Sequence, residues 1–231
     1  MSIFERTISL LAPPICVGCG VGGVGLCEGC IASQIVGYGE RCWRCGRLSA
    51  GCRTCKSCRW FRGPRYVWLP TNYEDLAART IKAYKFQHKR YLSEDIAGLM
   101  TETFWEYNSS EIIKRSGYLV VSLPTATARI RERGFDHSSL LAKTIAQKLN
   151  MEYRPVLGRL AQDSQVGAIR TQRLKQLEGK FFVKNEKAVN GRNVLLIDDV
   201  LTTGGSLRAA VKCLRLAGAK HVDALVFAKK L

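Results

Sequence analysis

Nine of the ten cysteines lie before residue 59, and eight of them form pairs with two residues between the thiols. The pairs are Cys16 and Cys19, Cys27 and Cys30, Cys42 and Cys45, and Cys55 and Cys58, with Cys52 left over. A C-x2-C turn offers two thiolates to one metal ion, and two such turns complete a tetrahedral zinc site with no open position for catalysis. We therefore predict two structural zinc sites, one from the first two pairs and one from the last two. A reduced or disulfide-linked cysteine cluster is the alternative.

The cysteine-rich segment also sets the expected domain boundary. Some 60 residues with little hydrophobic periodicity cannot build a core alone, so bound metal would supply the folding energy. Gly20–Gly25 matches the dinucleotide pattern G-x-G-x-x-G, but it lies between cysteine pairs and not between a strand and a helix, so we discard it. We predict a cysteine-rich zinc-binding module over residues 1–65 and a second domain over residues 66–231.

The second domain alternates between strand-like and helix-like segments. The expected strands are residues 66–72, 117–124, 181–183, 194–198 and 222–228, and the expected helices are 73–86, 93–107, 138–149 and 206–217. Ser93 is expected to cap the second of these helices. Alternation of this kind predicts an α/β fold with a mostly parallel sheet flanked by helices on both faces.

Residues 194–206 read VLLIDDVLTTGGS and suggest a ligand site. We expect Asp198 and Asp199 to end a strand, where open parallel sheets bind their ligands. The following turn of hydroxyls and glycines leads into a helix, and its backbone N–H groups suit a phosphate. The lysine of a P-loop is absent, which argues against an ATPase. The alternative is an acidic cap before an ordinary helix.

The charge of the chain points to an anionic partner. There are 36 Lys and Arg against 19 Asp and Glu, a formal net charge of +17. Such an excess favours nucleic acid or phosphorylated ligands. No run of 18 apolar residues exists, so we expect no membrane span. Glu5 interrupts the basic start that a signal peptide requires, so we expect a cytoplasmic protein with reduced thiols.

Four parts of the chain together resemble a known family. VLLIDDVLTTGGS resembles the phosphoribosyl pyrophosphate motif of type I phosphoribosyltransferases. With residues 73–90, residues 122–138 and the C-x2-C pairs, the resemblance is to the ComF family of competence-related proteins. It implies a zinc ribbon fused to a phosphoribosyltransferase domain. It also implies a role with incoming single-stranded DNA during natural transformation, alongside proteins of the DNA-uptake machinery.

The resemblance implies a role for each matching residue. Asp198 and Asp199 would be the catalytic pair that holds the ribose hydroxyls. The 5-phosphate would bind to Thr202, Thr203, Gly204, Gly205 and Ser206, and pyrophosphate with magnesium would face Leu123, Pro124 and Thr125. Arg129 and Arg133 match the arginines of the family's R-x3-R-G-F segment. Asp136 and His137 stand where the family usually has Asn-Gln, and we expect His137 to be a surface or capping residue.

Two basic segments are further candidates for ligand contact. Residues 159–179 include Arg170, Arg173 and Lys175, and the corresponding loop of such transferases can close over the site. The basic stretch also includes Arg129, Arg131 and Arg133, and we consider it a candidate contact surface for DNA. The alternative is a solvated loop. Tyr84 and Phe86 alternate with basic residues such as Lys85, and we weigh base stacking against core packing for them.

Three functions therefore remain open. The first is a DNA-handling competence protein that keeps a phosphoribosyl pyrophosphate pocket. The second is an active phosphoribosyltransferase in base or nucleotide metabolism. The third is a regulator that senses the ligand without turnover. The motif predicts the pocket in all three cases and does not distinguish among them.

Overall fold

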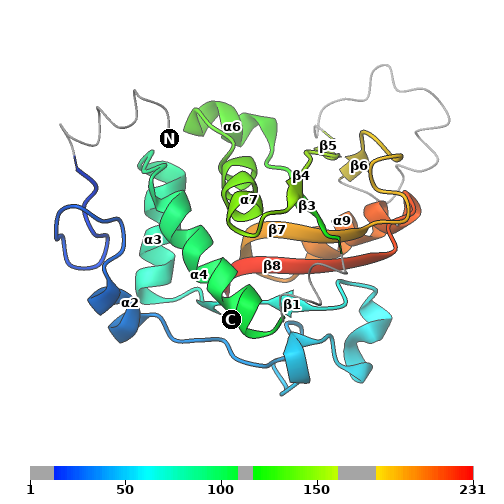
Figure 1. The fold of residues 1–231 in the computed structure, drawn as a ribbon, viewed down its shortest axis with the longest axis horizontal. Helices are drawn as coiled ribbons and strands as arrows, with labels where there is room; N and C mark the ends of the chain where they lie inside the picture. The colour runs from blue at the N-terminus through cyan, green and yellow to red at the C-terminus, as the bar shows by residue number, and fades with distance from the viewer. Residues whose placement is uncertain (1–12, 109–116, 161–180, 231) are drawn as a thin grey trace.

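A computed structural model describes residues 13–108, 117–160 and 181–230 of the 231-residue chain (Figure 1). The basic loop residues Arg170, Arg173 and Lys175 lie outside these described residues. Within the described ranges, no helix has both the length and the apolar character needed to cross a membrane.

The centre of the fold is a parallel sheet. Its strands are β1 (Val67–Trp68), β2 (Thr71–Asn72), β3 (Leu119–Ser122), β4 (Glu152–Tyr153), β7 (Asn193–Leu201) and β8 (His221–Lys229). Their order is β1-β8-β7-β3-β4, and β2 also pairs with β8. A separate antiparallel pair joins β5 (Leu157–Arg159) to β6 (Phe181–Val183). The central strands are buried along most of their length, as expected when both faces of a parallel sheet are covered.

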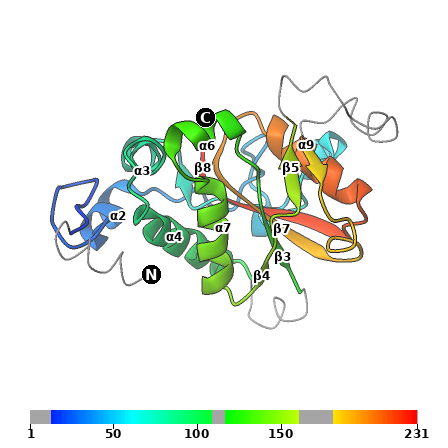
Figure 2. The same ribbon diagram turned by 90° about the horizontal axis from the view of Figure 1, so that it is seen from above.

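Helices cover both faces of this sheet (Figure 2). They are α3 (Asp75–Phe86), α4 (Leu92–Glu106), α6 (Thr127–Arg133), α7 (His137–Lys148) and α9 (Gly205–Leu216). Alternate residues of β7 point to opposite faces, so Leu195 and Ile197 join the core of α3, α4 and α7. Val194 and Leu196 join the core that contains α9.

The predicted fold class is confirmed, and several details of the prediction are wrong. The expected strand over 66–72 is two short strands, β1 and β2, separated at Leu69 and Pro70, since proline has no N–H for a sheet. The expected strand over 194–198 continues to Leu201, so the two acids lie inside β7 and not at its end. Helix α4 begins at Leu92, which places Ser93 in its first turn and not at its cap. Helix α6 was not predicted.

The cysteine-rich segment packs onto the sheet domain in two places. It contains the helix α2 (Glu28–Gln34) and two 3₁₀ helices, η1 (Ala50–Cys52) and η2 (Lys56–Phe61). Cys16, Leu26 and Cys30 join the core of α3, α4 and α7. Trp43 and Phe61 join the other core, with α9. The first half of the segment thus packs against one layer of the fold, whereas the second half adds Trp43 and Phe61 to the other layer and Cys52 to the first.

Candidate functional site

The site lies where β7 runs past the end of β3. Ser122, the last residue of β3, pairs with Ile197, and the Leu123 N–H donates to the Ile197 carbonyl at 2.9 Å. Strand β7 then continues to Leu201 with β8 as its paired neighbour. Asp198 and Asp199 therefore follow the point where the β3 ladder stops. This edge, at the carboxyl ends of parallel strands, is where such sheets bind ligands.

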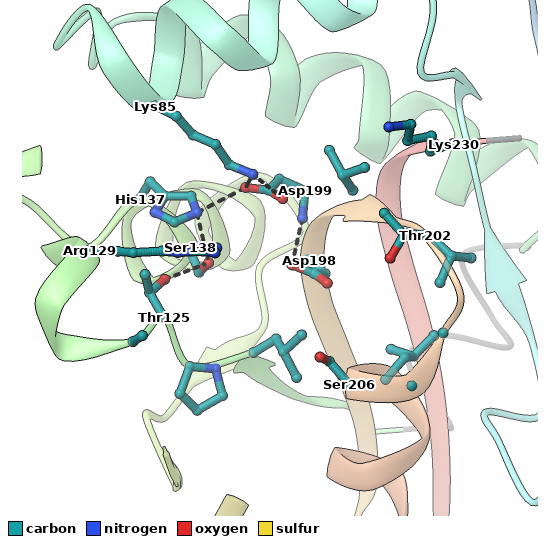
Figure 3. A pocket seen from close by; sticks show the side chains of 18 of the residues that line it. Lys85, Thr125, Arg129, His137, Ser138, Asp198, Asp199, Thr202, Ser206 and Lys230 are labelled. Atoms are coloured by element: carbon teal, nitrogen blue, oxygen red, sulfur yellow. Dashed lines mark hydrogen bonds and ion pairs between the residues drawn. The ribbon is translucent and has the colours of Figure 1, made fainter. Parts of the chain in front are cut away.

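A cavity of about 390 Å³ opens at this edge (Figure 3). All twelve residues predicted to bind or act on the ligand line it. They are Leu123, Pro124, Thr125, Arg129, Arg133, Asp198, Asp199, Thr202, Thr203, Gly204, Gly205 and Ser206. The fold thus brings the loop after β3, helix α6 and the turn after β7 around one space.

The turn between β7 and α9 has a backbone suited to an anion. Gly204 caps α9 with φ of +76°, in the left-handed region that glycine adopts without strain. Gly205 then begins a 12-residue helix, and the Gly205 N–H lies 3.4 Å from Thr203 Oγ1. The first N–H groups of a helix have no carbonyl partners within it and carry a partial positive charge, so a phosphate can bind there.

The two acids have different surroundings. Lys85 Nζ contacts both oxygens of the buried Asp199 carboxylate, at 2.8 and 2.7 Å, and His137 Nε2 lies 2.9 Å from Oδ2. Burial alone would raise the pKa of Asp199, but the hydrogen bond from His137 and the charge of Lys85 outweigh burial and hold that pKa below its usual range. For Asp198, burial and the neighbouring negative charge raise the pKa to about 8. Asp199 therefore stays ionised near neutral pH, whereas Asp198 holds a proton more readily.

Basic side chains also line the cavity, some of them directly beside Asp199. Arg133 is buried, its Nη1 lies 3.0 Å from His137 Nδ1, and its guanidinium lies over the Phe86 ring. Arg129, Arg159 and Lys230 also line the cavity. Several cations around a cavity beside a helix N-terminus suit a ligand with more than one phosphate group.

The start of α7 orients the loop after β3. Asp136 caps the helix, since its side chain accepts from the Ser139 N–H at 3.2 Å and from Ser139 Oγ at 2.7 Å. Thr125 Oγ1 donates to the same carboxylate at 3.2 Å. His137 is only 4% exposed and points to Asp199, so the prediction of a surface residue is wrong. Asp136 therefore caps α7, whereas His137 lines the cavity.

The structure brings together the two cysteine sets that the spacing predicts. Cys16, Cys19, Cys27 and Cys30 form one set, and Cys42, Cys45, Cys55 and Cys58 form the other. Within each set, all four Sγ atoms lie within 4.8 Å of one another. Zn–S bonds of about 2.3 Å in a tetrahedral site require sulfur atoms about 3.8 Å apart, so each set could hold structural zinc. Two backbone N–H groups also lie 3.4 Å from Cys16 Sγ, a position that favours a thiolate.

Comparison with known proteins gives a domain and a set of relatives. The model of the phosphoribosyl transferase domain matches residues 136–231. Competence protein ComFC of Bacillus subtilis (strain 168) is 29% identical over 199 residues, which cover 82% of this chain and 77% of that protein. ComFC of Streptococcus pneumoniae is 27% identical over 203 residues, covering 85% and 84% of the two chains. Competence protein F of Haemophilus influenzae is 26% identical over 215 residues, covering 86% and 88%.

The resemblance to the ComF family is confirmed. Among solved structures, the allosteric regulatory enzyme of purine biosynthesis aligns with 63% of this ComF-like chain at 16% identity and a TM-score of 0.44, but this chain spans only 29% of that enzyme's chain. A hypoxanthine phosphoribosyltransferase from Staphylococcus aureus aligns with 60% of the chain at 13% identity and a TM-score of 0.34.

Sequence reasoning missed the contact between Lys85 and Asp199 in the ComF-like pocket. Lys85 lies near the end of α3, in a segment that we considered for base stacking. Tyr84, its neighbour, is fully buried and donates to the His137 carbonyl at 2.7 Å, so core packing describes Tyr84 correctly. A lone lysine between two aromatic residues carries no signal of an ion pair with a residue 114 positions later.

Proposed function

We propose that this ComF-like protein binds phosphoribosyl pyrophosphate in the cavity beside β7. The turn at 202–206 would take the 5-phosphate, and the carboxylates of Asp198 and Asp199 would accept hydrogen bonds from the ribose hydroxyls. The pyrophosphate would lie towards Thr125, Arg129 and Arg133. The observation that carries the proposal is the convergence of an acid pair, a helix N-terminus and several cations on one cavity of about 390 Å³.

The cavity also fits a magnesium ion brought in with the ligand. Magnesium prefers oxygen ligands and is usually bound through one or two carboxylates together with substrate phosphates. Asp198 offers a carboxylate that is not engaged by Lys85, since that lysine contacts Asp199. When bound, magnesium would supply positive charge to the pyrophosphate. The protein's own part is to hold Asp199 ionised through Lys85 and His137 and to position the ribose.

Calorimetry with phosphoribosyl pyrophosphate and magnesium tests this proposal. The double variant Asp198→Asn with Asp199→Asn keeps the side-chain volumes and should lower affinity by at least about a hundredfold, because two charge-assisted hydrogen bonds are lost. Glu94→Gln is the matched control, since Glu94 pairs with Lys148 away from the cavity. Equal affinity of the double variant and the wild type would exclude the assigned site.

Transfer of the phosphoribosyl group to a base is a second candidate. The position of the fixed anion Asp199 favours it, because carboxylates stabilise the cationic sugar that forms when a glycosidic bond breaks. Pyrophosphate release in the presence of each common base tests turnover. Binding without release would identify a ligand-sensing role.

The similarity to competence proteins and the charge of +17 support a role with single-stranded DNA during DNA uptake. We assign the contact to the surface around the second cysteine set, and not to Arg129, Arg131 and Arg133 as the sequence suggested. Arg133 is buried and Arg129 lines the cavity, so only Arg131 of the three is exposed and outside the cavity lining. On the new surface, Trp60 is 70% exposed and Arg44 lies over its ring. Residues 40–62, which contain the second cysteine set, include one acidic residue, Glu40. Their basic residues are Arg41, Arg44, Arg47, Arg53, Lys56, Arg59 and Arg62.

Exposed aromatic rings beside cations bind single strands because unpaired bases stack on the ring while the cations neutralise phosphates. A gel-shift series at rising salt should show tighter binding to single strands than to duplex. Trp60→Ala should weaken single-strand binding about tenfold, the loss of one stacked base. Trp105→Ala is the control, since Trp105 is also partly exposed but lies on α4. Equal effects of the two variants, or no shift at low salt, would contradict this assignment.

A further inference from the structure

One residue of the second cysteine set reaches the phosphate-binding turn. Trp43 lies between Cys42 and Cys45 and is only 2% exposed. A Cβ atom on Gly204 would lie 2.3 Å from Trp43 Cζ3 and 2.9 Å from Cη2, so the indole fills the space next to this glycine. A Cβ on Gly63 would lie 2.7 Å from Cζ2. The indole is thus held between two glycines, one of which caps α9.

The Trp43 indole is connected to both cysteine pairs of the second set, through its own place in the chain and through a hydrogen bond. Trp43 Nε1 donates to Thr54 Oγ1 at 2.9 Å, and Thr54 Oγ1 donates to the Pro64 carbonyl at 2.6 Å. Trp43 follows Cys42 in the chain, and Thr54 precedes Cys55, so each lies next to a cysteine of the second set. A metal ion that ties the two pairs together would therefore fix the indole from both sides.

A second contact links the same set to the helix that begins at the turn. Phe61 follows Cys58 in η2 and meets the Trp43 ring edge-on, with 5.7 Å between the ring centroids. The Arg208 guanidinium, on the first turn of α9, lies 4.8 Å from the centre of the Phe61 ring. Leu201 and Leu207, on either side of the turn, belong to the same buried cluster as Trp43. The turn and the start of α9 therefore pack against Trp43 and Phe61 of the second cysteine set.

We propose that Trp43 is a positioning residue that couples metal binding in the second cysteine set to ligand binding at the turn. The indole holds Gly204 in its left-handed conformation, so the N–H groups of the turn are arranged before the phosphate arrives. A preorganised site loses less conformational freedom on binding and therefore binds more tightly. Because coupling between two sites is reciprocal, the ligand must also strengthen metal retention by the same factor. This inference rests on the proposed function only for the identity of the ligand.

The first test replaces the indole and keeps both metal sets. Trp43→Val introduces the residue type found at the equivalent position of the first set, Val17. With zinc content unchanged, affinity for phosphoribosyl pyrophosphate with magnesium should fall about tenfold, a typical coupling, and Trp43→Phe should recover part of it. The control Val17→Ala should leave affinity within about twofold, well inside that coupling. Wild-type affinity in a zinc-loaded Trp43→Val protein would overturn the inference.

The second test measures the metal and not the ligand. Zinc release to a chelator is followed in Cys19→Ser with Cys27→Ser, which leaves the second set intact, and in Cys45→Ser with Cys55→Ser, which leaves the first. The ligand should slow release about tenfold from the second set alone, the same factor as the coupling above. Adding Trp43→Val should remove that protection. Equal protection of both sets would show general stabilisation by the ligand and overturn the inference.

A third measurement separates failure of the inference from failure of the proposed function. Hydrogen exchange of the segment 200–208 is compared, without ligand, before and after loss of the metal from each set. Faster exchange after loss from the second set alone is expected. If the wild type binds no phosphoribosyl pyrophosphate but exchange responds in this way, the proposed function fails and the coupling stands. If exchange responds equally to both sets or to neither, the coupling fails.

Discussion

The two cysteine sets have the same first turn and different neighbours. In the first set, the Gly20 N–H donates to the Cys16 carbonyl at 2.9 Å, and in the second the Gly46 N–H donates to the Cys42 carbonyl at 2.8 Å. Both glycines have positive φ, of +82° and +73°. Each turn also closes with an antiparallel bridge, Ile15 with Gly22 and Arg41 with Leu48. The backbone of the metal turn is thus repeated in the chain.

The two turns differ in the residue that follows their first cysteine. Val17 in the first turn is partly buried against the core of α3 and α4, and its carbonyl accepts from Arg79 on α3. Trp43 in the second turn is buried against Gly204, in the turn between β7 and α9. The C-x2-C geometry fixes the metal site, whereas the two residues inside it are free to vary. Under the coupling that we propose, this one residue would decide whether a bound metal supports only the fold or also the turn at 202–206.

Loss of metal from one set at a time is expected to have the largest effect. Each pair of Cys→Ser changes, Cys19 with Cys27 or Cys45 with Cys55, should remove one equivalent of zinc. Each should lower the free energy of unfolding by more than about 2 kcal/mol, since structural zinc contributes to folding directly. Only the second should also lower ligand affinity, by at least about tenfold. Metal analysis, urea unfolding and calorimetry measure the three quantities.

Two outcomes would break the comparison between the sets. Equal loss of affinity in both variants would mean that ligand binding responds to overall stability. If the zinc content of a variant does not change, the substituted set holds no metal. That result would contradict the prediction from the cysteine spacing.

Alanine at matched glycines gives the second-largest contrast. Gly204→Ala adds a methyl group that overlaps the Trp43 indole and also strains a left-handed residue, so it should cost about 2–4 kcal/mol. Gly46→Ala has a similar φ but no atom within 4 Å of the new methyl group, so it should cost about 1 kcal/mol. Urea unfolding of zinc-loaded proteins measures both changes.

A double-mutant cycle separates the two costs at Gly204. Combined with Trp43→Val, Gly204→Ala should lose its steric cost and approach the cost of Gly46→Ala, because only backbone strain remains. Additive effects of Trp43→Val and Gly204→Ala would show that the two residues do not interact.

The fold class followed from the sequence because its signals are local. Alternating apolar runs predict the strands and helices of residues 66–231, and the spacing of cysteines predicts the two metal sets without knowledge of the fold. The parallel-sheet pattern predicts the site at Asp198, Asp199 and the turn that follows them. The other pocket residues, Leu123, Pro124, Thr125, Arg129 and Arg133, came only from the resemblance to the ComF family, and they line the same cavity. The strand end did not follow from the sequence, since β7 continues through Asp198 and Asp199 to Leu201.

The contacts that tune the pocket did not follow from the sequence because they join distant residues. Lys85 and His137 reach Asp199 from α3 and α7, across 114 and 62 positions of the chain. Trp43 reaches Gly204 across a still longer separation, and a tryptophan inside a C-x2-C turn has no pattern that names its partner. Tertiary packing decides which residues far apart in sequence come into contact. A single sequence contains no motif for such contacts.

The smallest expected effect concerns the neighbour of the first set. A Cβ on Gly25, two residues before Cys27, would meet Asp95 Oδ2 on α4. Burial raises the pKa of Asp95 to about 6, partly offset by a hydrogen bond from the Leu26 backbone. The folded protein therefore binds a proton more tightly here than the unfolded chain. The stability that Asp95 contributes is present below its ordinary pKa, near 4, and is lost as the pH rises through about 6.

Asp95→Asn keeps the shape and removes this titration. At pH 7 the variant should be more stable than the wild type by up to about 1 kcal/mol, a reduced value because Asp95 is partly exposed. The advantage should shrink as the pH falls from 7 to 5, while zinc stays bound, and urea unfolding at each pH follows it. Ligand affinity should not change, because the first set supports α3 and α4 and not the phosphate-binding turn. An advantage independent of pH, or a changed affinity, would mean that the first set acts on the pocket as well and that the contrast between the sets does not hold.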